Sequence, residues 1–277
     1  MIGITQFFAD LANPQLSFLA KALLVAVLSS VTCGAVGCHV IIRGMSFIGD
    51  AVAHAVFPGI AIAFVFSGSL LLGGAVAGII VAVLVAVLAQ NQKVREDAII
   101  GILFAASFAV GVVIISRAQG YTGSLMSFMF GSITGIPNSD LLWVGIVTIG
   151  VLAVLALFHK KLVAVALDRE MAQAKGLRVL ALDILLYVAV ACAVVISVRT
   201  IGNVLVLALL IAPAAAARLL TNDLPTMMVV AGVIGAVSSF VGLYVSWSAD
   251  LPTGATIVLV ATAAFLAALT VSRIHRA

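Results

Sequence analysis

Long apolar stretches alternate with short polar ones along the whole chain. A helix that crosses a bilayer needs about 20 predominantly apolar residues, and nine stretches come close to or exceed that length. The pattern therefore predicts an all-α polytopic membrane protein, a bundle of about eight to nine transmembrane helices. The lower number applies if the stretch that contains Pro213 is broken and merges with a neighbour. The nine stretches lie at about residues 16–42, 47–67, 69–89, 98–116, 140–158, 179–198, 202–219, 226–247 and 253–271.

Composition indicates the same class of protein. Of the 277 residues, 64% are hydrophobic and 9% are charged, whereas a soluble domain is about 45–50% apolar and about 25% charged. No polar segment is long enough to be a separate soluble domain, so we expect a single transmembrane domain over residues 1–277. The net charge of +4 is attributed to basic loops at the membrane surface and not to nucleic-acid binding.

The basic residues predict the orientation of the chain in the membrane. Of the 14 lysines and arginines, Lys21 lies inside the first stretch, and only Arg117 and Arg199 fall on one face if there are nine spans. Because cytoplasmic loops carry the excess of Lys and Arg, we expect the C-terminus in the cytoplasm and, with nine spans, the N-terminus outside. Before the first span, Phe7 and Phe8 indicate a short helix that lies on the membrane. The basic residues of the other face are Arg43, Lys93, Arg95, Lys160, Lys161, Arg169, Lys175, Arg178, Arg218, Arg273 and Arg276.

Asp50 and His54 stand four residues apart in "GDAVAHAVFPG" (49–59), so on a helix they share one face. Counted from Arg43 at 1.5 Å per residue, Asp50 lies about 10 Å and His54 about 16 Å into a hydrocarbon core about 30 Å thick. Ionisable groups at that depth need a partner or a water-filled path. A carboxylate oxygen and an imidazole nitrogen suit Mn²⁺, Fe²⁺ or Zn²⁺, and a twofold dimer would double these ligands. A buried Asp–His hydrogen bond and a proton relay stay open as alternatives.

Pro58 and Gly59 follow this pair on the same segment. Pro58 has no N–H for the carbonyl of His54, so we expect a kink, and Gly59 adds pliability. Irregular backbone inside a membrane is tolerated only where it is buried in protein or lines a cavity, which makes the two residues candidates for a gate. His39 and Asp183, in contrast, lie within about a turn or two of cytoplasmic helix ends and are expected to face headgroups.

Residues 160–178, "KKLVAVALDREMAQAKGLR", form the longest polar-rich stretch. Charged residues interrupt apolar ones in a way that indicates a short amphipathic helix, and Gly176 marks its end. A helix of this kind either lies on the membrane surface or docks a soluble partner. The sequence also contains no GxxxxGK[ST] loop for ATP and no HExxH motif, so we expect no enzymatic site and no permanently bound cofactor.

Five segments in order along the chain resemble the membrane permeases of metal-type ABC importers, which serve zinc, manganese and iron uptake. The resemblance covers most of the chain and implies a type II ABC importer fold in a prokaryotic cell membrane. The segments are "IIRGMSFIGDAVAHAVFPGIAIAF" (41–64), "FGSITGI" (130–136), "ALDREMAQAKGL" (166–177), "GNVLVLALLIAPAAAARLL" (202–220) and "TGATIVLV" (253–260).

This resemblance implies partners and residue roles. The partners are a second permease copy in a homodimer, cytoplasmic ABC ATPase subunits and an extracellular metal-binding solute-binding protein. Asp50 and His54 match the positions that line the translocation path. ATP would be hydrolysed on the separate subunits, which accounts for the missing ATP loop. The stretch that matches the family's ATPase-coupling motif contains Asp168, Glu170, Ala172, Ala174 and Gly176, with Arg169 inside it.

The expected cargo is a divalent metal ion. "HAVFPG", with Pro58, resembles manganese-type members more than zinc-type members, so Mn²⁺ is expected first and Zn²⁺ next. One alternative is a secondary transporter that couples metal movement to protons through Asp50 and His54. Another is an ABC permease for chelated iron or cobalamin, which would need a wide pore and no bare ligands.

Overall fold

A computed structural model describes residues 3–45, 47–66, 68–90, 94–116 and 138–276, and these ranges fold into helices joined by turns, without a strand. The helices are α1 (Ile4–Ala12), η1 (Pro14–Leu16), α2 (Ser17–Ile42), α3 (Ile48–Val65), α4 (Leu70–Leu88), α5 (Glu96–Ser116), α7 (Asn138–Leu167), α8 (Arg169–Ala174), α9 (Val179–Ile201), α10 (Asn203–Leu220), α11 (Leu224–Ala249) and α12 (Thr253–Arg276). The resembling segment at 130–136 and Arg117 lie outside the described residues.

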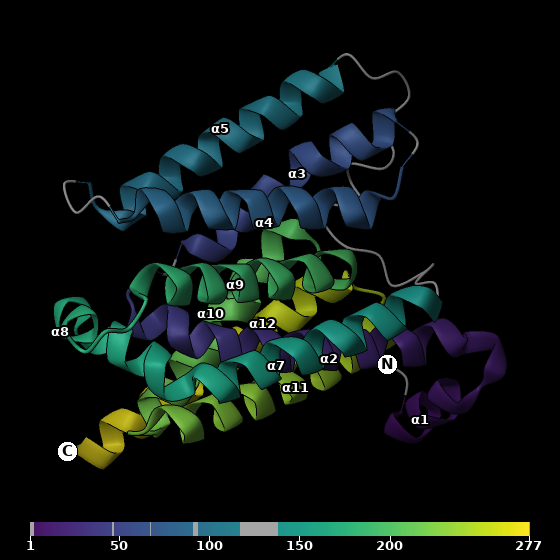
Figure 1. The fold of residues 1–277 in the computed structure, drawn as a ribbon. Helices are drawn as coiled ribbons and strands as arrows, with labels where there is room; N and C mark the ends of the chain where they lie inside the picture. The colour runs from purple at the N-terminus through teal and green to yellow at the C-terminus, as the bar shows by residue number, and fades with distance from the viewer. Residues whose placement is uncertain (1–2, 46, 67, 91–93, 117–137, 277) are drawn as a thin grey trace.

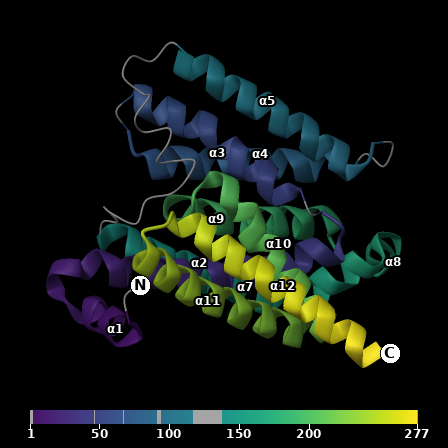
Figure 2. The ribbon, with the colours of Figure 1, turned by 180° about the vertical axis from the view of Figure 1, so that it is seen from behind.

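Each of the nine predicted stretches corresponds to one helix of the described chain. Seven of these helices are long and apolar enough to cross a membrane, and the remaining two, α4 and α10, are apolar but shorter over their described parts. Helix α10 continues through Pro213, so the stretch at 202–219 is not broken. Figures 1 and 2 show α1 at one end of the molecule and α8 with the C-terminus at the other. Termini at opposite ends agree with an odd number of crossings.

The helices form two neighbouring groups. Helices α3, α4 and α5 lie together on one side of the molecule, beside the remaining helices (Figure 1). Helix α2 packs on α7, α9, α10 and α11, and its glycines allow close approach: a Cβ at Gly37 would overlap the backbone oxygen of Leu210. Helix α4 joins the two groups, because it packs on both α3 and α9.

Local backbone signals end several of these helices. Glycines with positive φ, which L-residues with side chains rarely adopt, follow α2 (Gly44), α8 (Gly176) and α9 (Gly202). Asp223 accepts a hydrogen bond from the backbone N–H of Thr226 and so caps the start of α11. These signals set where the chain turns back and therefore which helix ends lie together.

Three expectations about single residues are wrong. Asp183 and His39 do not face headgroups, because both are buried, with 0% and 1% exposure. Phe7 does not lie on the membrane, because it is buried against Phe240 and Tyr244 of α11. Phe8, its neighbour on α1, is 55% exposed. Helix α1 is thus anchored to α11 through one face.

Candidate functional site

Asp50 and His54 lie on one face of α3, one helical turn apart. His54 Nε2 is 3.5 Å from Asp50 Oδ1, and the two side chains are 20% and 32% exposed. That distance is longer than an ordinary hydrogen bond. The two side chains therefore lie beside each other, and both are partly open to the surroundings of the chain.

Two phenylalanines of α5 hold the imidazole ring of His54. Its centroid is 4.7 Å from that of Phe104 and 5.4 Å from that of Phe108, and both pairs meet edge to face. Phe108 in turn stacks on Phe57 of α3, with centroids 5.8 Å apart. Aromatic pairs prefer such geometries, so α5 restricts the orientation of the His54 ring.

The depth of Asp50 and His54 was counted along a continuous helix from Arg43, but the structure has a turn after that residue. Helix α2 ends at Ile42 and α3 begins at Ile48, with a turn at Gly44 between them. At 1.5 Å per residue, His54 lies about 9 Å from the start of α3 and about 4 Å from its midpoint. Asp50 lies about 10 Å from that midpoint, on the side of α8.

Pro58 and Gly59 lie where three helices approach closely. Helix α3 continues through Pro58, and the kink stays a prediction. A Cβ at Gly59 would overlap the carbonyl oxygen of Gly73 on α4, and one at Gly111 on α5 would overlap the ring of Phe57. These glycines thus let α4 and α5 pack closely against α3 near Pro58.

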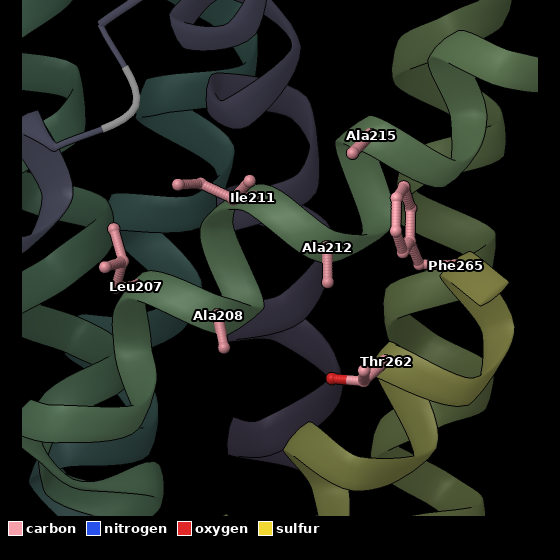
Figure 3. A pocket seen from close by; sticks show the side chains of 7 residues that line it. All are labelled: Leu207, Ala208, Ile211, Ala212, Ala215, Thr262 and Phe265. Atoms are coloured by element: carbon pink, nitrogen blue, oxygen red, sulfur yellow. The ribbon is translucent and has the colours of Figure 1, made fainter. Parts of the chain in front are cut away.

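One copy of the chain does not complete a metal site among its described residues. No group of three or more His, Cys, Asp or Glu side chains there could hold a metal ion, so Asp50 and His54 stand as a pair. A groove of about 360 Å³ lies between α10 and α12 (Figure 3). Its lining has no ionisable side chain and suits an apolar occupant better than a cation. The lining residues are Leu207, Ala208, Ile211, Ala212, Ala215, Thr262 and Phe265.

The predicted amphipathic helix is α8, and it is shorter than the polar-rich stretch. Residues 160–167 continue α7, and α8 itself spans Arg169–Ala174. Asp168 accepts a hydrogen bond from the backbone N–H of Met171 at 2.8 Å and so caps α8. Ala172 is buried and faces the bundle, and Gly176, with φ of 77°, ends the turn that follows. Glu170 and Ala174 are exposed, as are Asp168 and Gly176.

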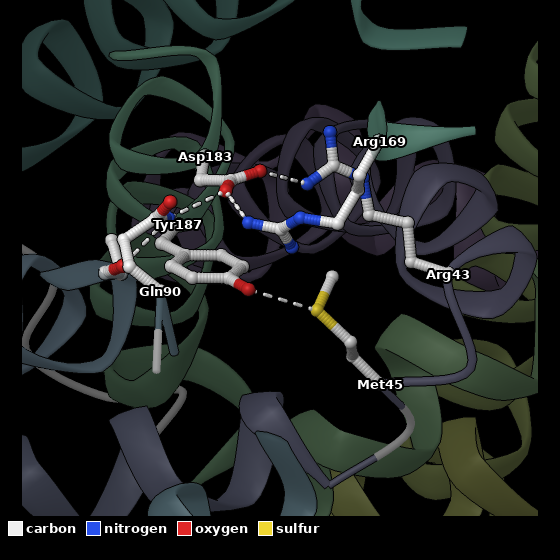
Figure 4. Close-up of polar contacts among 7 residues, drawn as sticks. Arg43, Met45, Gln90, Arg169, Asp183 and Tyr187 are labelled. Atoms are coloured by element: carbon white, nitrogen blue, oxygen red, sulfur yellow. Dashed lines mark hydrogen bonds and ion pairs between the residues drawn. The ribbon is translucent and has the colours of Figure 1, made fainter. Parts of the chain in front are cut away.

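The structure also brings together a polar cluster that the sequence did not predict. Asp183 on α9 accepts hydrogen bonds from Arg43 at 2.6 Å, Arg169 at 2.5 Å and Gln90 at 3.1 Å (Figure 4). Of the predicted ATPase-coupling residues, Arg169 is the one that reaches this cluster. The signal in the sequence was Asp183 itself, an acidic residue within an otherwise apolar stretch.

Comparisons with known proteins agree with this architecture. The family described as "ABC 3 transport family" matches residues 15–272. The manganese transport system membrane protein MntC of Halalkalibacterium halodurans is 40% identical over 266 residues, which cover 96% of this chain and 90% of that protein. A probable iron transport system membrane protein of Haemophilus influenzae is 35% identical over 91% of this chain and 89% of its own length. A solved structure described as PsaBC from Streptococcus pneumoniae in complex with Fab has a TM-score of 0.85 at 32% identity, covering 96% of this chain and 95% of that chain.

Proposed function

The chain belongs to the ABC 3 transport family, and on this premise we propose that it is the permease subunit of an importer for a divalent transition metal ion. The ion passes Asp50 and His54, and ATP hydrolysis on separate subunits drives its movement. The observation that carries the proposal is the pair itself. It is a carboxylate and an imidazole 3.5 Å apart, near the middle of an otherwise apolar helix, where ionisable groups are costly unless they serve a path.

Mn²⁺ is the cargo that we propose first, with Zn²⁺ next. Oxygen and neutral imidazole nitrogen ligands suit both ions, and a 40% identical relative bears the name of a manganese transport protein. The 35% identical relative is named for iron, so the same chemistry admits Fe²⁺ as a competitor. Competition between these ions in uptake experiments would therefore identify the metal. The proposed site for each ion is the same, Asp50 and His54.

A homodimer would complete the metal site. Two ligands are too few to hold a divalent ion, and the described part of one chain brings no third candidate to Asp50 and His54. A twofold axis beside α3 places the same two donors from a second copy opposite the first. The site would then contain two carboxylates and two imidazoles.

The end of the molecule that carries α8 is the proposed ATPase side. Helix α8 lies at the same end as the C-terminus (Figure 2), which the basic residues predict to be cytoplasmic. Glu170 and Ala174 are exposed there, and Met171 is 54% exposed. An exposed apolar side chain among charges suits a docking surface for another protein. The opposite end would receive the extracellular metal-binding protein.

The test is metal uptake by the reconstituted importer. The permease is combined with its ATPase subunits in liposomes, the metal-binding protein is added outside, and uptake of Mn²⁺ is measured with ATP inside. We expect the Asp50→Ala and His54→Ala variants each to abolish uptake while the complex still assembles. His159→Ala on α7 removes another half-buried imidazole and should retain uptake close to that of the wild-type chain.

Two outcomes would contradict the proposal. Normal uptake by both the Asp50 and the His54 variant would exclude the site and would favour a chelated cargo that needs no bare ligands. Metal uptake by the permease alone, driven by a proton gradient, would show a secondary transporter. The importer should instead be inactive without its ATPase subunits.

A further inference from the structure

Asp183 connects three segments that are distant in sequence. Its carboxylate accepts hydrogen bonds from Arg43, which follows α2, from Gln90, which follows α4, and from Arg169, the first residue of α8. Figure 4 shows the two guanidinium groups reaching the carboxylate from the same side. The ends of α2 and α4 and the start of α8 are thus held to one side chain on α9.

A second contact from α9 holds the turn that leads into α3. The hydroxyl of Tyr187, one helical turn after Asp183, donates to the Sδ atom of Met45 at 3.2 Å. Tyr187 and Met45 are buried, with 0% and 1% exposure. Arg43 and Met45 are two residues apart, so α9 fixes the turn at two points. Helix α3 begins at Ile48, directly beyond this turn.

Burial of Asp183 makes its ion pairs with Arg43 and Arg169 unfavourable to separate. The side chain of Asp183 is 1% exposed, that of Arg43 is 6% exposed and that of Arg169 is 33% exposed. Removing one partner of a buried pair leaves an uncompensated charge, which is strongly unfavourable. If α8 moved away from α9, the ion pair between Arg169 and Asp183 would break. The buried carboxylate of Asp183 would then lose one of its two cations, so this separation is unfavourable.

We propose that Asp183 is the positioning residue that transmits movement of α8 to the start of α3. The path runs from Arg169 through Asp183 to Arg43 and Met45, and then along five residues of chain to Asp50. This inference rests on the proposed function, because it takes α8 as the ATPase-docking helix and Asp50 as part of the metal path. It adds the connection between those two places.

The test separates transmission from folding and from docking. In proteoliposomes that contain the full importer, the number of Mn²⁺ ions imported per ATP hydrolysed is measured for Arg169→Gln and Arg169→Lys. We expect Arg169→Gln to lower this ratio about fivefold or more, the lower end of typical coupling between sites. Arg169→Lys retains the cation and should recover part of the ratio. Arg178→Gln, at an exposed arginine before α9, is the matched control and should retain the wild-type ratio.

Every other result overturns the inference. An unchanged ratio in Arg169→Gln shows that the ion pair transmits nothing. A parallel fall of uptake and hydrolysis, or loss of the ATPase subunits from the complex, assigns Arg169 to docking. A fall of the thermal unfolding temperature with an unchanged ratio assigns the cluster to folding.

A second variant addresses the carboxylate directly. Asp183→Asn keeps the shape of the side chain and one oxygen acceptor, and it should lower the ratio in the same way as Arg169→Gln. The double variant should then be no worse than the more affected single variant, because both changes interrupt one path. Additive losses would contradict a single path. Failure of the proposed function looks different, because wild-type permease would then import no Mn²⁺ or the Asp50 and His54 variants would import it normally.

Discussion

Gly59 of α3 and Gly73 of α4 pack backbone against backbone. A Cβ on either glycine would overlap the carbonyl oxygen of the other, so neither position has room for a side chain. The contact lies directly beyond Pro58 and five residues from His54. The two glycines therefore set how closely α4 approaches the helix that carries Asp50 and His54.

Gly59→Ala should destabilise the protein. The added methyl group meets backbone atoms of α4, which cannot rotate away as a flexible side chain would. Overpacking of this kind costs about 1–3 kcal/mol, and we expect a lower thermal unfolding temperature in detergent together with slower metal uptake. Gly101→Ala on α5 is the control. A Cβ there meets nothing within 4 Å, so its unfolding temperature should not fall. Equal effects of the two substitutions would contradict the close packing.

Phe104→Ala should slow metal uptake without abolishing it. Phe104 meets the His54 ring edge to face at 4.7 Å, and an aromatic pair contributes about 1 kcal/mol beyond burial. Loss of that contact frees the imidazole to rotate, and we expect the initial rate of Mn²⁺ uptake to fall about fivefold. Ile102→Ala is the control on the same helix, since Ile102 is 66% exposed. A Phe104→Ala rate equal to that of the control would show that the ring does not orient His54.

Properties that depend on neighbouring residues could be predicted from the sequence. The nine apolar stretches correspond to nine helices because length and hydropathy are local, and the membrane class and family resemblance are confirmed. The shared face of Asp50 and His54 also follows from helix periodicity, and the structure places them together. The end of the amphipathic helix at Gly176 is likewise a local signal, and the structure has a positive φ there.

Properties that depend on distant residues could not be predicted. Arg43 and Gln90 reach Asp183 across 140 and 93 residues of sequence, and nothing local in the sequence shows that these helix ends meet. A charged residue near a helix end can contact lipid headgroups or can be buried in an ion pair. The position of Asp183 in the sequence does not distinguish between these two environments. The turn at Gly44 is not visible in the apolar pattern either, and it interrupts the helix along which the depth of His54 was counted, although His54 still lies near the middle of α3.

Asp168→Ala should weaken binding of the ATPase subunits. The side chain of Asp168 accepts the backbone N–H of Met171, and loss of an N-cap costs about 1 kcal/mol of helix stability. A helix of six residues has few other internal hydrogen bonds, so α8 should fray. We expect an approximately fivefold higher Kd for the purified ATPase subunit on detergent-solubilised permease. Asp168→Asn retains a capping oxygen and should bind close to wild type. If the Asn and Ala variants bind equally weakly, the carboxylate itself contacts the partner and capping is not its role.

Gly44→Ala should destabilise the turn between α2 and α3. Gly44 has φ of 73°, and no atom lies within 4 Å of the place where a Cβ would stand. The effect is therefore conformational and not steric crowding, at a cost of about 1–2 kcal/mol for a residue with a side chain. Asn adopts this region more readily than Ala, so Gly44→Asn should unfold in detergent at a temperature between those of Gly44→Ala and the wild-type chain. A glycine that is free to change φ behaves differently, because its replacement by Ala stabilises a protein by about 0.4–1 kcal/mol. An unfolding temperature of Gly44→Ala above that of the wild type would thus show that the turn is not held in this conformation, and that Arg43 and Met45 do not fix it.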